Sequence, residues 1–178
     1  MGPEWEQGRM GAIDIRRARE DDLPSLVVIL NHYILNGHVT FDIEPTTVAA
    51  KQPWLASYGT GRHQLIVAEE GGRVLGCAYS SRYRQHPAFD ATVETSIYLD
   101  PAERGRGTGT RLYGELLKRL ETQDVHLAVA GVALPNEASI ALHRKLGFEE
   151  VGIFKEYAIK HGELISSIWF QHRIPSVA

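Results

Sequence analysis

The sequence predicts a mixed α/β fold in which a strand, two helices, three strands, a helix, a strand, a helix and two strands follow one another. Three observations predict it. Some short segments alternate apolar with polar residues, as strands do, and others repeat apolar residues every three or four positions, as helices do. Turns that contain Gly or Pro separate these segments. With 178 residues and 43% hydrophobic content, the chain can form one domain with a substantial core.

The first segments predict a strand followed by two helices. Residues 13–17 alternate as a strand, and the acidic residues and proline of residues 21–24 suit the first turn of a helix. The apolar face of that helix is Leu23, Leu26, Val27, Leu30 and Ile34. The helix should end at Asn36-Gly37, because glycine readily takes the left-handed conformation. A weaker helix should begin near Thr46-Thr47, where Pro53 favours two short pieces over one long helix.

Three strands should follow these helices. Residues 65–69 and 74–82 flank Gly71-Gly72, which is a hairpin signal. The third strand, residues 92–99, should present Glu94, Ser96 and Tyr98 on one face and Val93, Thr95, Ile97 and Leu99 on the other.

The C-terminal half alternates helices with strands. A helix with the apolar face Leu112, Tyr113, Leu116, Leu117 and Leu120 should precede a strand over residues 127–134. Residues 136–146 predict another helix, and residues 148–156 and 165–172 predict two last strands around a turn at His161-Gly162. Because a helix connects the strands at 92–99 and 127–134, this pair should be parallel in a mixed sheet.

Composition argues against several classes of protein. The net charge of −3, with dispersed Lys and Arg, argues against a nucleic-acid partner. No apolar run approaches the roughly 20 residues needed to span a membrane, so no membrane partner is predicted. The single Cys77 is expected in the packed core, and the eight histidines lack ligand spacing, so no metal is predicted.

The chain is expected to have one functional domain preceded by a short arm. Residues 1–11 lack the apolar stretch of a secretory signal and should be an N-terminal arm, either disordered or left over from cloning. Residues 12–174 should form the functional domain, and the expected location is the cytoplasm.

The segment Leu99–Gly109 is the most informative turn. A strand leads into it and a helix leads out, so the free backbone N–H groups at the helix N-terminus can bind an anion. Arg104 and Arg106 add positive charge for phosphate oxygens. The backbone can approach a ligand closely at three glycines: Gly105, Gly107 and Gly109.

Two kinds of nucleotide-binding turn do not fit this segment. A P-loop requires a lysine after its glycines, and none follows here. A dinucleotide-binding turn requires a third glycine three residues after Gly107, where Thr110 stands. The segment does match the Arg/Gln-x-x-Gly-x-Gly/Ala signature of the GCN5-related N-acetyltransferases. The alternative is a tight turn whose arginines face solvent.

The resemblance extends over nearly all of residues 13–174. The segments Val93–Pro101, Gly131–Ser139, Leu142–Phe148, Asn31–Ile34 and Lys160–Gly162 resemble those of the phosphinothricin and methionine sulfoximine acetyltransferases. This resemblance implies the GNAT fold, a mixed central sheet splayed between two parallel strands with acetyl-CoA in the gap. It also implies a homodimer.

By this resemblance, acetyl-CoA would be the cosubstrate. Its diphosphate would bind the glycine-rich turn, and its pantetheine arm would pair like a strand with the backbone of residues 97–99. Asn136 would cap the next helix and reach the pantetheine. The predicted cofactor-binding residues are Ile97, Tyr98, Leu99, Arg104, Gly105, Arg106, Gly107, Thr108, Gly109, Asn136 and His143.

Three residues are predicted to act in catalysis. Glu94 would be the general base that neutralises the acceptor ammonium; the alternative is a sheet glutamate paired with an arginine. His143 stands where many acetyltransferases have a tyrosine near the coenzyme sulfur, and it can be a proton donor to the thiolate or a structural residue. The backbone N–H of Leu99 is the predicted oxyanion donor.

The acceptor is expected to bind among cationic and aromatic residues: Phe41, Arg82, Tyr83, Arg84, His86, Phe89, Glu94 and Tyr98. Guanidinium groups suit a carboxylate or phosphinate, although Arg82 and Arg84 can also belong to a solvated strand face. His86 and Phe89 stand where the family usually has arginine and tyrosine, so methionine sulfone, methionine sulfoximine or an analogue competes with phosphinothricin. A protein N-terminus or lysine as acceptor, and a noncatalytic acyl-CoA-binding module, remain alternatives.

Overall fold

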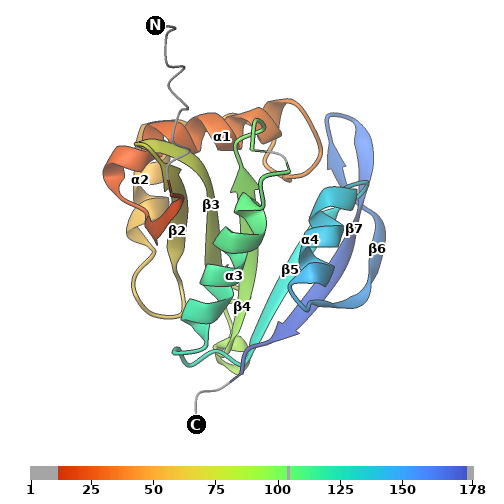
Figure 1. Ribbon diagram of the computed structural model, residues 1–178. Helices are drawn as coiled ribbons and strands as arrows, with labels where there is room; N and C mark the ends of the chain where they lie inside the picture. Colours follow the sequence, from red (N-terminus) through yellow and green to blue (C-terminus); the bar gives the residue numbers. More distant parts are fainter. Residues whose placement is uncertain (1–11, 104, 176–178) are drawn as a thin grey trace, which may run out of the picture.

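The computed structural model describes residues 12–103 and 105–175, which form a seven-stranded mixed sheet with helices on both faces (Figure 1). The predicted arm, residues 1–11, lies outside the described residues. The strands are β1 (Asp14–Arg17), β2 (Leu65–Glu70), β3 (Arg73–Arg82), β4 (Thr92–Leu99), β5 (Leu127–Ala133), β6 (Glu149–Lys160) and β7 (Glu163–Arg173). The helices are α1 (Leu23–Leu35), α2 (Val48–Ala56), α3 (Thr108–Leu120) and α4 (Glu137–Lys145), with short 3-10 turns η1 (Glu20–Asp22) and η2 (Pro87–Phe89).

The two faces of the sheet carry separate apolar clusters. On one face, Leu116 of α3 and Ile140 of α4 belong to the same buried cluster as Val93 of β4. On the opposite face, Leu26 of α1 belongs to a cluster with Cys77 of β3, which is buried as expected. Successive strand residues point to opposite faces, so β2 and β3 contribute to both clusters. None of the helices within residues 12–103 and 105–175 is long and apolar enough to cross a membrane.

The strand order in the sheet is β1-β2-β3-β4-β5-β7-β6, and β4 and β5 are paired only at their N-terminal ends. The last pair that joins these parallel strands is Glu94↔Val129. Beyond it, β4 stays paired with β3 up to Leu99, while β5 stays paired with β7 up to Ala133. The sheet therefore forks after Glu94, and Figure 1 shows the two ribbons moving apart. The predicted parallel pair and splayed sheet are confirmed; we call this opening the fork.

The remaining predicted elements are present in the expected order, with differences at α2 and β6. α2 is one helix that contains Pro53, so the prediction of two short pieces is wrong. Proline removes only one backbone donor there, and Thr47 holds the helix start by accepting a hydrogen bond from the N–H of Ala50 at 3.2 Å. β6 is longer than expected because its register shifts between Phe154 and Ala158, which interrupts the alternation visible in the sequence.

Candidate active site

The turn between β4 and α3 presents open backbone. Gly105 and Gly107 have φ angles of 75° and 77°, in the left-handed region that favours glycine. An added Cβ at either position would meet no atom within 4 Å, so the space beside the turn is open to a ligand. Gly107 is the N-cap of α3 and has no side chain to satisfy the first N–H groups of the helix. Those donors are therefore available to an anion.

Gly109 has a different reason to be glycine. A Cβ there would lie 3.2 Å from Cδ1 of Leu99, so the missing side chain lets α3 approach β4 closely. The predicted turn thus contains two glycines needed for backbone conformation and a third needed for packing.

Arg106 is engaged by two carboxylates. Its guanidinium donates to Glu103 at 2.9 Å and to Glu70 at 2.8 Å. Glu103 is 3% exposed and also accepts a hydrogen bond from Thr108 at 3.4 Å. These contacts hold the turn, and they occupy the side chain that was expected to bind phosphate oxygens. The role of Arg106 stays a prediction, as does that of Arg104, which lies outside the described residues.

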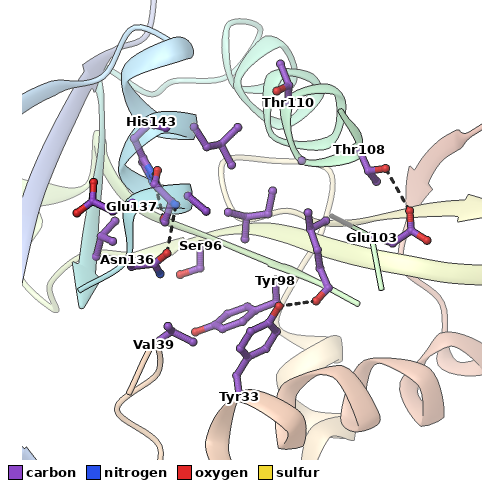
Figure 2. Close-up of a pocket in the computed structure, with 18 of the residues that line it drawn as sticks. Tyr33, Val39, Ser96, Tyr98, Glu103, Thr108, Thr110, Asn136, Glu137 and His143 are labelled. Atoms are coloured by element: carbon purple, nitrogen blue, oxygen red, sulfur yellow. Dashed lines mark hydrogen bonds between the residues drawn. The ribbon is translucent and has the colours of Figure 1, made fainter. Parts of the chain in front are cut away.

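A cavity of about 730 Å³ is lined by residues from both arms of the fork. Figure 2 shows Thr108 of α3, His143 of α4 and Tyr98 of β4 around this space. The lining includes all the described residues predicted to bind cofactor except Arg106: Ile97, Tyr98, Leu99, Gly105, Gly107, Thr108, Gly109, Asn136 and His143. The size and the open turn at one end suit an elongated ligand with an anionic group.

The backbone of β4 is available to a ligand inside the fork. The N–H of Asp100 donates to the carbonyl of Leu75 at 2.7 Å, which makes Gly76↔Leu99 a non-hydrogen-bonded pair of the β3–β4 ladder. The N–H of Leu99 therefore points away from β3, toward the gap. Tyr33 of α1, to which the sequence analysis gave no role, lines the cavity and donates its hydroxyl to the Leu99 carbonyl at 2.8 Å.

His143 is buried, and both of its ring nitrogens are in hydrogen bonds. Nδ1 lies 2.7 Å from the carbonyl oxygen of Ser139, and Nε2 lies 3.2 Å from the hydroxyl oxygen of Tyr113. Burial lowers the pKa of His143, although the Ser139 carbonyl opposes this change. The geometry fits a structural role, and the role of proton donor stays a prediction. Asn136 caps α4 as expected, because its side chain accepts from the N–H of Ser139 at 3.2 Å.

Glu94 is half-buried on β4, and burial raises the pKa of its carboxyl group above the ordinary value. In the described part of the chain, no ion pair joins Glu94 to an arginine, which disfavours the alternative of a paired sheet glutamate. Glu94 itself does not line the large cavity. Ser96, two residues further along the same strand face, does line it.

Aromatic rings gather beside the segment that follows β3. Arg84 lies over the rings of Tyr83 and Phe89, at 5.1 Å and 5.4 Å from their centroids, and His86 contacts Phe89 at 6.1 Å. Successive ring contacts continue to the predicted Phe41. We call the following residues the aromatic cluster: Phe41, Tyr83, Phe89, Phe154, Tyr157 and Trp169.

Three members of the aromatic cluster were missed as acceptor-site candidates: Phe154, Tyr157 and Trp169. Trp169 contacts Tyr83 at a centroid distance of 6.4 Å, and Tyr157 contacts Phe41 at 5.8 Å. No periodicity or charge pattern marks these residues in the sequence. Only the position of the β6–β7 hairpin relative to the other strands brings them together.

Arg82 lies on the other strand face from Glu94. The β3–β4 register pairs Ser81 with Glu94 and Arg82 with Val93. Cross-strand partners point to the same face, so Arg82 shares the face of the buried Val93. It lines a separate pocket of about 340 Å³ with Arg62 and other residues. Its role in binding an acceptor stays a prediction.

A forked sheet with an anion-binding turn, free strand backbone and a half-buried carboxylate defines an acyl-coenzyme-dependent transferase. The profile of the acetyltransferase (GNAT) family matches residues 26–148. The chain belongs to this family. It is an N-acetyltransferase that uses acetyl-CoA, and the open turn and the fork fit that cosubstrate. Among the described residues, no group of three or more His, Cys, Asp or Glu could hold a metal ion.

Several relatives are similar to this chain along most of their length. Phosphinothricin N-acetyltransferase of Streptomyces coelicolor is 40% identical, over 89% of this chain and 95% of that protein. The L-methionine sulfoximine/L-methionine sulfone acetyltransferase of Pseudomonas aeruginosa is 34% identical, over 88% and 92%. The crystal structure of a phosphinothricin acetyltransferase from Sinorhizobium meliloti with acetyl-CoA superimposes with a TM-score of 0.85 at 33% identity, over 92% of this chain and 89% of that one.

Proposed function

We propose that the protein acetylates the amine of a small amino-acid-like acceptor, such as phosphinothricin, methionine sulfone, methionine sulfoximine or an analogue, with Glu94 as general base. The observation that carries this proposal is the half-buried carboxylate of Glu94 at the closed end of the fork, which forms no ion pair with the residues that the structure describes. Burial raises the pKa of the Glu94 carboxyl group toward that of an amine. The Glu94 carboxylate is therefore a better proton acceptor than an exposed carboxylate.

Direct transfer requires Glu94 to remove a proton from the acceptor ammonium, either directly or through a water molecule. The free amine then attacks the thioester carbonyl; the new C–N bond forms and the C–S bond breaks. The second nitrogen proton is released, and the departing thiolate takes up one proton. The N–H of Leu99, which points into the fork, would stabilise the carbonyl oxygen as it gains negative charge.

The chemistry of the aromatic cluster supports an acceptor that is small and anionic. Arg84 lies beside the rings of Tyr83 and Phe89, and its guanidinium can bind a carboxylate or phosphinate. The names of the two relatives from Streptomyces coelicolor and Pseudomonas aeruginosa also point to acceptors of this kind.

A coenzyme-release assay tests the proposal. Purified protein and acetyl-CoA are mixed with methionine sulfone, methionine sulfoximine, phosphinothricin, a short peptide or no acceptor, and free thiol is measured. We expect turnover with at least one of the three amino-acid analogues and only background with the peptide. Preferential turnover of the peptide would indicate a protein acetyltransferase instead. Binding of acetyl-CoA without turnover of any acceptor would indicate a noncatalytic module.

We further propose a homodimer, a cytoplasmic location and a catalytic domain formed by residues 12–174. β6 is an edge strand with exposed apolar side chains, among them Val151, Ile153 and Ile159, which supports association with a second copy. Light scattering during gel filtration should give the dimer mass; a monomer at micromolar concentration would contradict this assignment. A variant limited to residues 12–174 should keep full activity, and cell fractionation tests the location.

A further inference from the structure

Three buried polar side chains form a chain of hydrogen bonds from β4 to α4. Thr95 and His143 are each 3% exposed, and Tyr113 between them is 0% exposed. The Tyr113 hydroxyl lies 2.7 Å from Oγ1 of Thr95 and 3.2 Å from Nε2 of His143. Buried polar groups destabilise a fold unless they are hydrogen-bonded. These three hydrogen-bonded side chains are therefore a distinct polar group within a largely apolar cluster.

The partners of His143 determine the direction of these hydrogen bonds. A carbonyl oxygen only accepts, so Nδ1 of His143 must carry the proton that faces Ser139. In the neutral ring, Nε2 then accepts the proton of the Tyr113 hydroxyl. The oxygen of Tyr113 is left to accept from Thr95, whose single hydroxyl proton is shared between Tyr113 at 2.7 Å and the carbonyl oxygen of Val129 at 3.2 Å. The whole chain therefore depends on the Tyr113 hydroxyl, which acts as donor and acceptor.

The hydrogen bonds from Thr95 through Tyr113 to His143 connect the two arms of the fork. Thr95 directly follows Glu94, the last residue of β4 that is paired with β5, and its Oγ1 lies 3.2 Å from the carbonyl oxygen of Val129. His143 belongs to α4, which follows β5 on the other arm. Thr95 and His143 both line the large cavity, whereas Tyr113 does not. Tyr113 can therefore influence a ligand in the fork through these two neighbours.

We propose that Tyr113 is a positioning residue whose hydroxyl, held between Thr95 and His143, sets the spacing of the two arms of the fork that receive acetyl-CoA. The inference builds on the use of the fork by acetyl-CoA and goes beyond the proposed acceptor and general base. Removing the Tyr113 hydroxyl leaves Nε2 of His143 without its partner and Thr95 with the Val129 carbonyl alone, so the two arms lose a fixed connection.

The test is to bind acetyl-CoA to Tyr113→Phe by calorimetry, with no acceptor present. Loss of one buried hydrogen-bonded group should raise the Kd by about tenfold. At saturating acetyl-CoA, kcat should stay within about twofold of the wild type, because Tyr113 does not line the cavity and Nδ1 of His143 keeps its partner, the Ser139 carbonyl. Nitrogen NMR of His143 should report the Nδ1–H tautomer in both proteins, because the Ser139 carbonyl is unchanged, and a shifted Nε2 signal in the variant, where the hydrogen bond from Tyr113 is lost. A general loss of stability would not shift Nε2 alone.

Two further variants control the experiment. Thr95→Val breaks the same chain at its other end and should raise the Kd similarly, and the double variant should be no worse than Tyr113→Phe alone. Tyr58→Phe removes a buried hydroxyl from the cluster on the opposite face of the sheet and should leave the Kd unchanged.

The proposal is overturned if folded Tyr113→Phe keeps the wild-type Kd, or if kcat falls while the Kd stays constant. If Tyr113→Phe does not fold, the Kd of Thr95→Val decides the question. Wild-type binding of acetyl-CoA and the acceptor screen test the proposed function separately, because the present inference concerns only the difference between wild type and variants.

Discussion

Glu94 lies opposite Val129 in the last residue pair that joins β4 to β5. The carboxylate is thus carried by a strand position that is still held on both sides, while the next residues of β4 have an open edge. Such a position combines a rigid backbone with access to the gap. This is what a general base requires when its distance to a bound amine must be fixed.

Replacing this carboxylate tests its role directly. Glu94→Gln keeps the size of the side chain but cannot accept the ammonium proton, so kcat should fall by about 100-fold or more. The Kd for acetyl-CoA should stay within a few-fold, because Glu94 does not line the large cavity. Thiol release and calorimetry measure the two quantities. Glu149→Gln, on the exposed edge strand β6, is the matched control. Equal loss of turnover and coenzyme binding would mean that Glu94 is structural.

The raised pKa of Glu94 predicts how activity and stability depend on pH. The base must be ionised, so kcat/KM should fall as the pH drops through a pKa above the ordinary 4.5, and Glu94→Gln should lack this dependence. Because the folded pKa exceeds the unfolded one, the folded protein binds the proton more tightly. The resulting stability is present at low pH and is lost as the pH rises through the folded pKa.

Glu94→Gln should therefore melt at a higher temperature than the wild type at pH 7, and this difference should shrink toward pH 4. Thermal unfolding followed by circular dichroism at both pH values measures it. A variant less stable than the wild type at pH 7 would show that the carboxylate is held by favourable contacts, contrary to the burial described above.

Alanine substitutions at two glycines should separate the effect on acetyl-CoA affinity from the effect on the stability of the protein. Gly107→Ala places a Cβ in the left-handed region, which costs about 1–2 kcal/mol of unfolding free energy. The Cβ meets no protein atom, but it enters the space expected to hold the coenzyme diphosphate, so acetyl-CoA affinity should fall by more than about tenfold. Gly162→Ala, in the β6–β7 turn, has a similar φ of 84° and equally open surroundings. It should lose similar stability and keep its affinity for acetyl-CoA; equal affinities in the two variants would exclude the turn from binding.

The parts of this site that follow local rules were predictable from sequence. Gly105 and Gly107 stand out because a strand-to-helix turn that exposes its backbone requires glycine at such positions. The strand face of Glu94 followed from the alternation of its strand, whereas its role as general base stays a prediction from the family resemblance. The pairing of β4 with β5 followed from the intervening helix, because such crossovers connect parallel strands.

The parts that depend on distant contacts were not predictable. Arg106 pairs with Glu70, 36 residues away, and no local pattern encodes that contact; its predicted binding of phosphate stays a prediction. Tyr113 fitted the apolar face of its helix, and its hydroxyl gave no sign of the partners at Thr95 and His143. Periodicity reports which face a residue occupies, but it does not report which polar atoms meet across the core.

Cys77 is predicted to be inert in the folded protein. It is fully buried, and burial raises the pKa of its thiol to about 12, so at pH 8 only roughly one molecule in ten thousand is thiolate. A thiol reagent should give no colour with the native protein and one equivalent after unfolding in urea, since the chain has a single cysteine. Reaction in the native state would contradict the burial of β3 and would also add background to the coenzyme-release assay.

Arg84 is predicted to recognise the carboxylate of the acceptor. Arg84→Ala should raise the KM for methionine sulfone by about tenfold or more, because a hydrogen bond to a charged group is lost. The KM for acetyl-CoA should not change. The amide of methionine sulfone, which lacks the carboxylate, should be affected little, and Arg173→Ala at the end of β7 provides a matched loss of one positive charge.

The sequence predicted that both Arg82 and Arg84 bind the acceptor, and Arg82→Ala tests whether both do. The β3–β4 register puts Arg82 on the face of Val93, away from Glu94, so we expect its effect on the acceptor KM to be much smaller than that of Arg84→Ala. If instead Arg82→Ala raises the acceptor KM and Arg84→Ala does not, the acceptor must bind on the other strand face. Glu94 could not then reach its amine, and the general base would have to be sought elsewhere.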